Sequence, residues 1–148
     1  MRRGYPLPVF EQAVHSLHAI GVQIITHVIL FLPGESEADM LATIHYLNTL
    51  PIDGIKLQLL HVLRDTDLYN DYQRYPFPLP SMEEYLDFSG HCLCALRPDI
   101  VVHRLTGDGP KPLLVAPLWT SNKRLVLNQM GKVFKEKDIW QGKTCRTL

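Results

Sequence analysis

Three apolar runs of this sequence are each followed by a short segment whose residue types could do chemistry. These segments are residues 32–35 (Leu-Pro-Gly-Glu), 61–66 (His-Val-Leu-Arg-Asp-Thr) and 106–110 (Thr-Gly-Asp-Gly-Pro). Their carboxylates, histidine and arginine can hydrogen-bond a polar small molecule, and their glycines let backbone approach a ligand closely. Glycine, proline and aspartate also dominate ordinary turns. Residue types alone therefore leave open whether these segments bind a ligand or only turn the chain.

Three of the seven histidines give a second candidate site. His27, His61 and His103 fall on or just after the same three apolar runs. Three histidines on neighbouring strands could bind zinc with a water as the fourth ligand, which would suit a metal-dependent hydrolase. However, His27 and His103 lie within their runs, whereas His61 lies at or beyond the end of its own. We therefore expect different heights in the sheet, and packed or hydrogen-bonded histidines rather than a metal site.

The three cysteines, Cys92, Cys94 and Cys145, do not form a disulfide framework in a chain of 148 residues. Cys92 and Cys94 lie in a predicted helix, where two residues of separation turn them about 200° apart. They cannot hold one metal ion while that helix is intact, and we expect buried thiols. The sequence contains neither a C-x-x-C motif nor an iron–sulfur spacing.

The elements that must position these segments alternate between helices and strands. The run at 22–31 is almost continuously apolar and β-branched, which is typical of a strand covered on both faces. Ser36 with Asp39, and Ser81 with Glu84, have the spacing of capping boxes that begin helices. The predicted helices are 7–20, 37–50, 67–72, 82–96 and 121–137, and the predicted strands are 22–31, 55–60 and 100–105.

This alternation predicts an α/β fold of parallel strands joined by helical crossovers. Three strands of this hydrophobicity make a poor free-standing sheet, and a complete (β/α) barrel takes about 250 residues. We therefore expect residues 1–148 to form a single part of a TIM-like (β/α) barrel.

Composition excludes several other classes of protein. The chain has 15 basic and 15 acidic side chains and no long run of one sign, which argues against a nucleic-acid or membrane-surface binder held by long-range attraction. No run of 18 apolar residues could span a bilayer, and the basic start breaks on prolines before a signal-peptide core can form. A cytoplasmic location is the expectation.

The segment Ile-Leu-Phe-Leu-Pro-Gly-Glu at 29–35, an apolar strand followed by a capped helix, is more specific. It resembles the fifth-strand segment of radical S-adenosylmethionine (radical SAM) enzymes. The closest likeness is to an uncharacterised, oxidoreductase-like branch related to the coproporphyrinogen dehydrogenase and elongator groups. Further segments resemble that branch in the same order along the chain: 53–56, 60–63, 104–108, 116–119 and 122–123.

This resemblance implies a partial (β/α) barrel in which the ends of two strands hold S-adenosylmethionine. Carried over to this sequence, Leu32, Pro33, Gly34 and Glu35 would line the cofactor. His61, Val62 and Leu63 would offer backbone groups towards its adenine. The sequence departs from the branch at Phe31, where glycine is usual and where a ring would crowd the cofactor.

The resemblance also implies a [4Fe–4S] cluster, held by a Cys-x3-Cys-x2-Cys motif that this sequence lacks. We therefore expect the C-terminal half of a radical SAM barrel, inactive without an N-terminal half that holds the cluster. Neither a substrate nor a catalytic residue is implied. The alternative is a non-catalytic interaction module, because an open sheet edge favours pairing with that N-terminal half or with a second copy.

Overall fold

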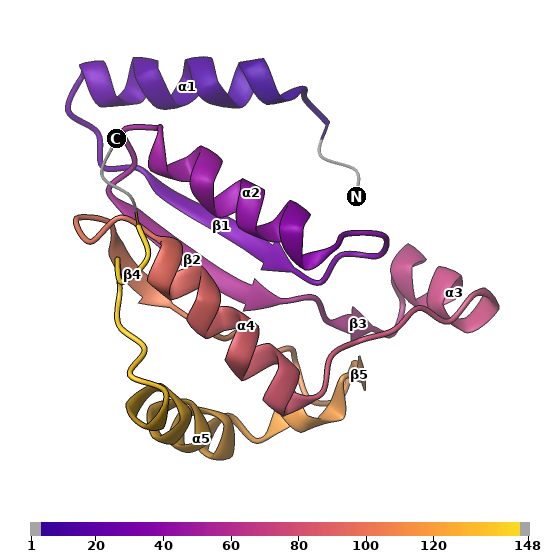
Figure 1. Cartoon of the computed structure of the whole chain (residues 1–148). Coiled ribbons are helices and arrows are strands. Elements are labelled where there is room, and N and C mark those ends of the chain that lie inside the picture. Colours follow the sequence, from indigo (N-terminus) through magenta and orange to yellow (C-terminus); the bar gives the residue numbers. More distant parts are fainter. Residues whose placement is uncertain (1–3, 146–148) are drawn as a thin grey trace.

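A parallel three-stranded sheet lies at the centre of the computed structural model, which describes residues 4–145 (Figure 1). The strands are β1 (Ile25–Leu30), β2 (Gly54–Leu59) and β4 (Val101–Arg104), in the order β1-β2-β4. Both neighbouring pairs are parallel, as the alternation of elements predicts. The α/β fold expected from the sequence is confirmed.

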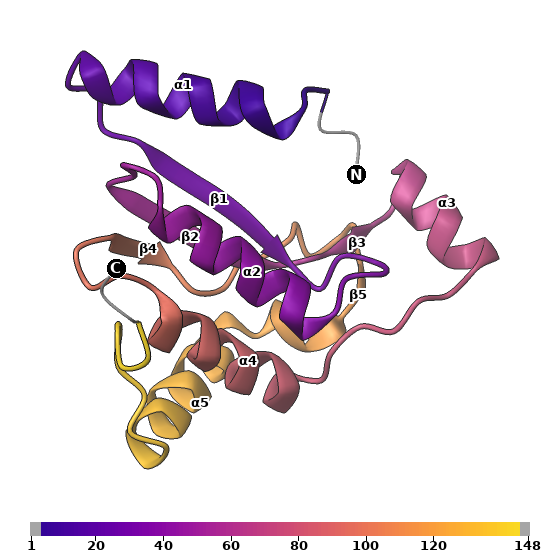
Figure 2. The same ribbon diagram turned by 45° about the horizontal axis from the view of Figure 1, so that its top comes forward.

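Helices cover one face of this sheet. α2 and α4 lie side by side on it, and α5 packs against α4 (Figures 1 and 2). α1 lies beyond the free edge of β1, whereas α3 projects from the carboxyl end of the sheet. Among residues 4–145, every helix is too short or too polar to span a lipid bilayer. The helices are α1 (Leu7–Ala19), α2 (Glu37–Asn48), α3 (Asp67–Arg74), α4 (Met82–Ala95) and α5 (Lys123–Glu136).

The core lies between the sheet and α2 and α4. Every second residue of β2 points into it, and Ile55 and Leu57 are fully buried there. Tyr85 and Phe88 fill the same layer from α4. Burying one such side chain contributes about 1.5–3 kcal/mol. The other face of the sheet carries exposed and half-buried residues.

A second, two-stranded sheet follows the first and was not predicted. β3 (Val62–Leu63) pairs antiparallel with β5 (Leu114–Ala116), and a 3₁₀ helix (Leu118–Ser121) comes next. Strands of two and three residues are too short to show a period in the sequence.

Several element bounds differ from those predicted. The strand predicted at 22–31 is β1, which begins three residues later, at Ile25, and ends at Leu30 because Phe31 leaves the extended conformation with a φ of 63°. The helix predicted at 121–137 begins at Lys123, since the Asn122 side chain accepts from the Leu125 amide and caps it. The helix predicted at 67–72 continues to Arg74. The remaining bounds shift by at most two residues.

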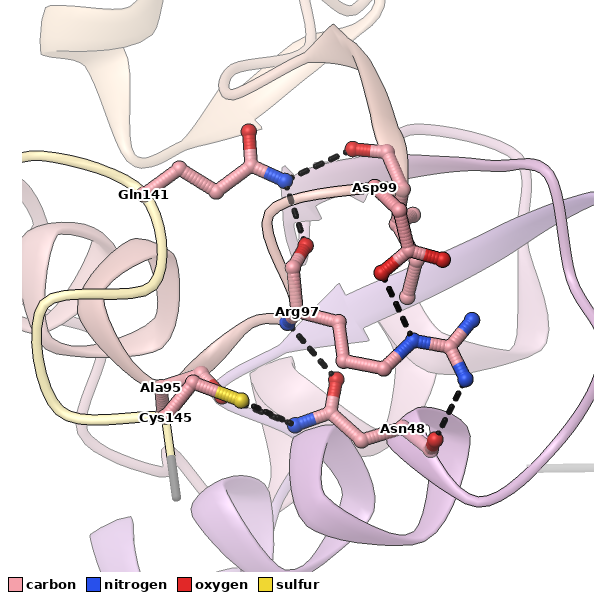
Figure 3. A network of polar contacts seen from close by, with 7 residues as sticks. Asn48, Ala95, Arg97, Asp99, Gln141 and Cys145 are labelled. Atoms are coloured by element: carbon pink, nitrogen blue, oxygen red, sulfur yellow. Dashed lines mark hydrogen bonds and ion pairs between the residues drawn. The ribbon is translucent and has the colours of Figure 1, made fainter. Parts of the chain in front are cut away.

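A hydrogen-bond network joins the end of α2 to the segment between α4 and β4 (Figure 3). The side-chain Nδ2 of Asn48 donates to the Ala95 carbonyl at 2.8 Å, and its side-chain Oδ1 accepts from the Arg97 backbone amide at 3.0 Å. The Arg97 guanidinium donates to the Asn48 carbonyl at 2.8 Å. Gln141 Nε2 donates to the carbonyls of Arg97 at 2.6 Å and Ile100 at 2.7 Å. These bonds join the ends of α2 and α4 to the segment after α5.

Candidate functional site

The loop after β1 is shaped by a tight turn. The Glu35 amide donates to the Leu32 carbonyl at 3.0 Å, and Gly34, at the third position of the turn, has a φ of +85°. Proline second and glycine third are the residues that a type II turn requires. The next residue, Ser36, caps α2 through a capping box with Asp39. The turn and the cap together fix Glu35 at the carboxyl end of the sheet.

A hollow of about 710 Å³ lies beside this loop. It is bounded by the turn after β1, the end of β2, α3 and the segment after α3. Both the loop and α3 contribute apolar side chains and carboxylates, one carboxylate from the loop and two from α3. The lining residues are Leu32, Pro33, Glu35, Leu60, Asp67, Leu68, Asp71 and Phe77. Both its volume and its mixture of apolar and polar groups are typical of small-molecule sites.

The electrostatics of this hollow favour a cationic ligand. Partial burial raises the pKa of Glu35 above its ordinary value, and the negative charge of Asp39 raises it further. Asp67 and Asp71 add two more carboxylates to the same hollow. A positive group placed there would stabilise the ionised form of Glu35.

Phe31 does not line this hollow. Its ring packs against those of Tyr85 and Phe88, with centroids 6.1 and 5.4 Å away, on the helix-covered side of the sheet. Its amide donates to Met40 Sδ at 3.0 Å. The crowding expected at this position therefore does not arise in the hollow. The φ of Phe31 is +63°, a left-handed conformation that glycine adopts more readily than other residues.

The second predicted segment lies apart from the first. The His61 ring packs against the loop after β4, where a Cβ added to Gly107 would lie 3.5 Å from its Cε1. Among the residues that the structure describes, His61 Nε2 is buried without a hydrogen-bond partner. Burial lowers the pKa of His61, although the charge of Asp108 opposes that shift.

Val62 and Leu63 form β3, opposite Ala116 and Leu114 respectively. Of the seven residues predicted to line a cofactor, Leu32, Pro33 and Glu35 thus line the hollow. Gly34 shapes the turn beside it, and His61, Val62 and Leu63 support the second sheet and its loop.

Sequence reasoning missed the contribution of α3. Asp67, Leu68 and Asp71 line the hollow from one face of this helix, and Phe77 follows it. The signal was present, because Asp67 and Asp71 are four residues apart and so share a helix face. The helix was predicted, but nothing in the sequence indicated that it turns back towards the loop after β1.

The histidines and cysteines do not form metal sites in the described part of the chain. Among residues 4–145, no three His, Cys, Asp or Glu side chains are placed to hold a metal ion. Cys92 and Cys94 are buried in α4, and burial raises the pKa of Cys92 to about 12. A protonated thiol in a packed helix is unsuited to an iron–sulfur cluster, which needs thiolates.

A larger hollow of about 900 Å³ lies elsewhere, on the outer side of the helices. It is lined by α2, α4 and the segment after α5, including His45, His91 and Cys94. None of its lining residues comes from a loop at the carboxyl ends of the strands, where parallel α/β folds place their ligands. The smaller hollow is therefore the candidate site.

The parallel α/β unit and the ligand-sized hollow at the carboxyl ends of its strands place the chain among α/β proteins with a candidate small-molecule site. Sequence comparison identifies the family. The family described as the Radical_SAM C-terminal domain matches residues 52–136, more than half of the chain. The chain belongs to this family.

Individual relatives match over almost the whole chain. Uncharacterized protein YtqA of Bacillus subtilis is 31% identical over 148 residues, and protein YhcC of Escherichia coli is 24% identical over 139 residues. MJ0486 of Methanocaldococcus jannaschii is 28% identical over 143 residues. These matches cover 94–100% of this chain but 44–46% of the relatives. The chain thus spans about half the length of the curated relatives it matches.

A solved structure shares the fold. Elp3 of Methanocaldococcus infernus, with an N-terminal deletion, matches with a TM-score of 0.79 and 20% sequence identity. The match covers 95% of this chain and 33% of that one. The arrangement of helices and parallel strands is therefore that of one part of a larger chain in Elp3.

Proposed function

We propose that this chain forms the cofactor-lining C-terminal portion of a radical SAM oxidoreductase-like protein. In this proposal the hollow at the carboxyl ends of β1 and β2 receives S-adenosylmethionine. The observation that carries the proposal is the position of Leu32, Pro33 and Glu35 on one wall of that hollow. Membership of the Radical_SAM C-terminal domain family supports it.

The residues present suit the chemistry of this cofactor. Leu60, Leu68 and Phe77 offer apolar surface for its adenine. Glu35, Asp67 and Asp71 can accept hydrogen bonds from ribose hydroxyls and attract its sulfonium and ammonium charges. When bound beside a reduced [4Fe–4S] cluster, S-adenosylmethionine supplies radical chemistry. The buried thiols of α4 do not suit that cluster, so in this proposal another part of the complete protein holds it, and the chain alone is inactive.

Titration of isotope-labelled protein with S-adenosylmethionine, followed by amide chemical shifts, tests this proposal. We expect shifts at Leu32, Gly34 and Glu35 and in α3, and tighter binding than for S-adenosylhomocysteine, which lacks the sulfonium charge. Glu35→Gln should reduce this preference about threefold, the effect of one partly exposed charge pair. Glu37→Gln, two residues further along at the start of α2 and outside the hollow, is the matched control. Unmoved amides at Leu32, Gly34 and Glu35 under saturating cofactor would contradict the proposal.

A second proposal concerns the free edge of β1. Among residues 4–145, β1 pairs with β2 alone, and a groove of about 850 Å³ runs along β1 between α1 and α2. Unpaired strand edges are templates for a further strand. Since relatives are about twice as long as this chain, we propose that a strand from the part of the protein outside this chain pairs there.

Mixing this chain with the part of YtqA that it does not cover tests the edge by sedimentation velocity. We expect a one-to-one complex and no dimer of this chain alone. Ile25→Asp should abolish the complex, because a charge on an edge strand opposes pairing. Val101→Asp, at the same level of the opposite edge strand, should leave it intact. A stable dimer of this chain alone, abolished by Ile25→Asp, would favour self-association instead.

A further inference from the structure

The face of the sheet turned away from α2 and α4 has an unusual composition. On β2, Ile55 and Leu57 point into the core, so Lys56 points to the opposite face. On β1, Thr26 is buried and His27 is exposed, so His27 lies on the same face as Lys56. This face therefore mixes basic side chains with apolar ones such as Ile25 and Val101, whereas the face of a two-sided α/β sheet carries mainly apolar side chains.

The strand register aligns the basic residues in one row. His27 of β1 lies directly opposite Lys56 of β2, and Lys56 lies directly opposite Arg104 of β4. Residues directly opposite one another in a sheet point to the same face. Since neighbouring strands lie about 4.8 Å apart, the Cα atoms of this row span about 10 Å. We name His27, Lys56 and Arg104 the basic row.

A β-bulge adds His103 beside the basic row. The partner of β2 changes from Val102 to Arg104 between Ile55 and Lys56, so His103 is the extra residue. Its ring covers Gly54, where an added Cβ would lie 2.7 Å from His103 Nε2. Gly54 and Lys56 are two residues apart on one strand and share a face. The bulge therefore directs both His103 and Arg104 to the uncovered face.

No carboxylate in the described part of the chain compensates this charge. Among residues 4–145, neither Lys56 nor Arg104 has an ion-pair or side-chain hydrogen-bond partner. Asp108, on the loop that follows β4, instead lies 3.2 Å from Lys123 Nζ. Two adjacent cations without a counter-ion repel each other, so an anion bound between them would stabilise this arrangement.

We infer that the basic row is a binding site for a multiply charged oxyanion group of a small molecule, either a phosphate or a dicarboxylate. Lysine and arginine are the side chains that bind such groups through charge-assisted hydrogen bonds. A span of about 10 Å suits a group with more than one negative charge better than a single carboxylate. In a closed barrel this face becomes the interior, so the anion belongs to a ligand held inside. The inference goes beyond the proposed function, because it concerns another face and needs no S-adenosylmethionine.

Titration of the labelled protein with inorganic phosphate, pyrophosphate and malonate at low ionic strength tests this inference. We expect saturable amide shifts at His27, Lys56 and Arg104 with pyrophosphate or malonate. Tighter binding of pyrophosphate would identify the ligand's group as a phosphate, and tighter binding of malonate would identify it as a dicarboxylate. Lys56→Gln and Arg104→Gln should each weaken binding about tenfold, the loss of one hydrogen bond to a charged group. Because Arg104 is exposed, its variant keeps the test valid if Lys56→Gln lowers stability.

Controls with the same change of net charge separate this site from general attraction. Lys132→Gln and Arg124→Gln remove exposed cations from α5, which packs on the helix side of the molecule. These two variants should bind within about twofold of the unmodified chain. An equal loss of binding in the α5 variants would overturn the inference, as would the absence of saturable shifts at the basic row. Both results are independent of S-adenosylmethionine, so they leave the proposed function unaffected.

Discussion

The two ends of the central sheet are built differently. At the amino end, the polar groups of Asn48, Arg97 and Gln141 are joined in one network of short hydrogen bonds (Figure 3). At the carboxyl end, Phe31 has a left-handed backbone, and His61 Nε2 is buried without a partner among the described residues. The amino end thus stabilises the parallel sheet, whereas the carboxyl end, where we propose that a ligand binds, has a less favourable backbone and an unsatisfied polar atom.

The largest effect that we predict concerns the amino end. Asn48→Ala removes the side-chain donor to the Ala95 carbonyl and the side-chain acceptor of the Arg97 backbone amide. Both backbone groups then lose these hydrogen bonds. Unsatisfied groups of this kind cost about 1–3 kcal/mol each, so the free energy of unfolding should fall by about 2–4 kcal/mol. Denaturant unfolding measures this change. Asn70→Ala, at an exposed position of α3, should change stability by less than about 0.5 kcal/mol. Equal effects at both positions would remove the contrast between the two ends.

A smaller change in stability is expected at Phe31, where glycine should be less destabilising than alanine. Phe31→Ala should lower stability by about 1–3 kcal/mol, because the ring packs on Tyr85 and Phe88 but remains half-buried. Phe31→Gly loses the same ring but relieves the left-handed backbone, so it should be about 1 kcal/mol more stable than Phe31→Ala. Ala42→Gly, within α2, should show the opposite order and lose about 1 kcal/mol. If glycine is the worse residue at both positions, the carboxyl end stores no such strain.

The smallest predicted effect is a difference in pKa between the carboxyl groups of Glu35 and Glu84. The pKa of Glu35 should lie above its ordinary value, because burial and the charge of Asp39 oppose ionisation. The pKa of Glu84 should lie below its ordinary value, since the Ser81 amide and hydroxyl stabilise its ionised form. Carboxyl-carbon NMR titration measures both. Asp39→Asn should lower the pKa of Glu35 and leave that of Glu84 unchanged.

The two shifts act on stability with opposite signs. Ionisation of Glu35 is disfavoured in the folded state, so Glu35 lowers stability as the pH rises through its folded pKa. Glu84 contributes stability above its unfolded pKa and loses that contribution as the pH falls through its lower folded pKa. Equal titration of the two groups would contradict the proposed burial of Glu35 at the hollow.

The fold was predictable where local signals agree with tertiary packing. The capping boxes at Ser36 and Ser81 mark the starts of α2 and α4, and the apolar runs mark β1 and β2. Of the candidate site, the turn at 32–35 was predictable from its proline and glycine. The wall supplied by Asp67 and Asp71 was not, because it depends on how α3 packs back towards that turn.

The basic row shows why the remainder could not be predicted. His27, Lys56 and Arg104 are separated by 29 and 48 positions in the sequence, and only the register of three strands makes them neighbours. The bulge at His103 shifts that register by one residue. Without the bulge, Arg104 would point to the helix-covered face, and no period in the sequence reveals a single inserted residue.

The position of Gln141 has a consequence for the order of events during synthesis. Its Nε2 donates to carbonyls 44 and 41 residues earlier in the chain, at Arg97 and Ile100. A ribosome makes the chain from its amino end, so α2, β2, α4 and β4 all exist before these two carbonyls gain their donor. The amino end of the sheet therefore reaches its final hydrogen bonding only after α5 has been made, and a nascent chain stalled within α5 should remain accessible to proteases at residues 97–100.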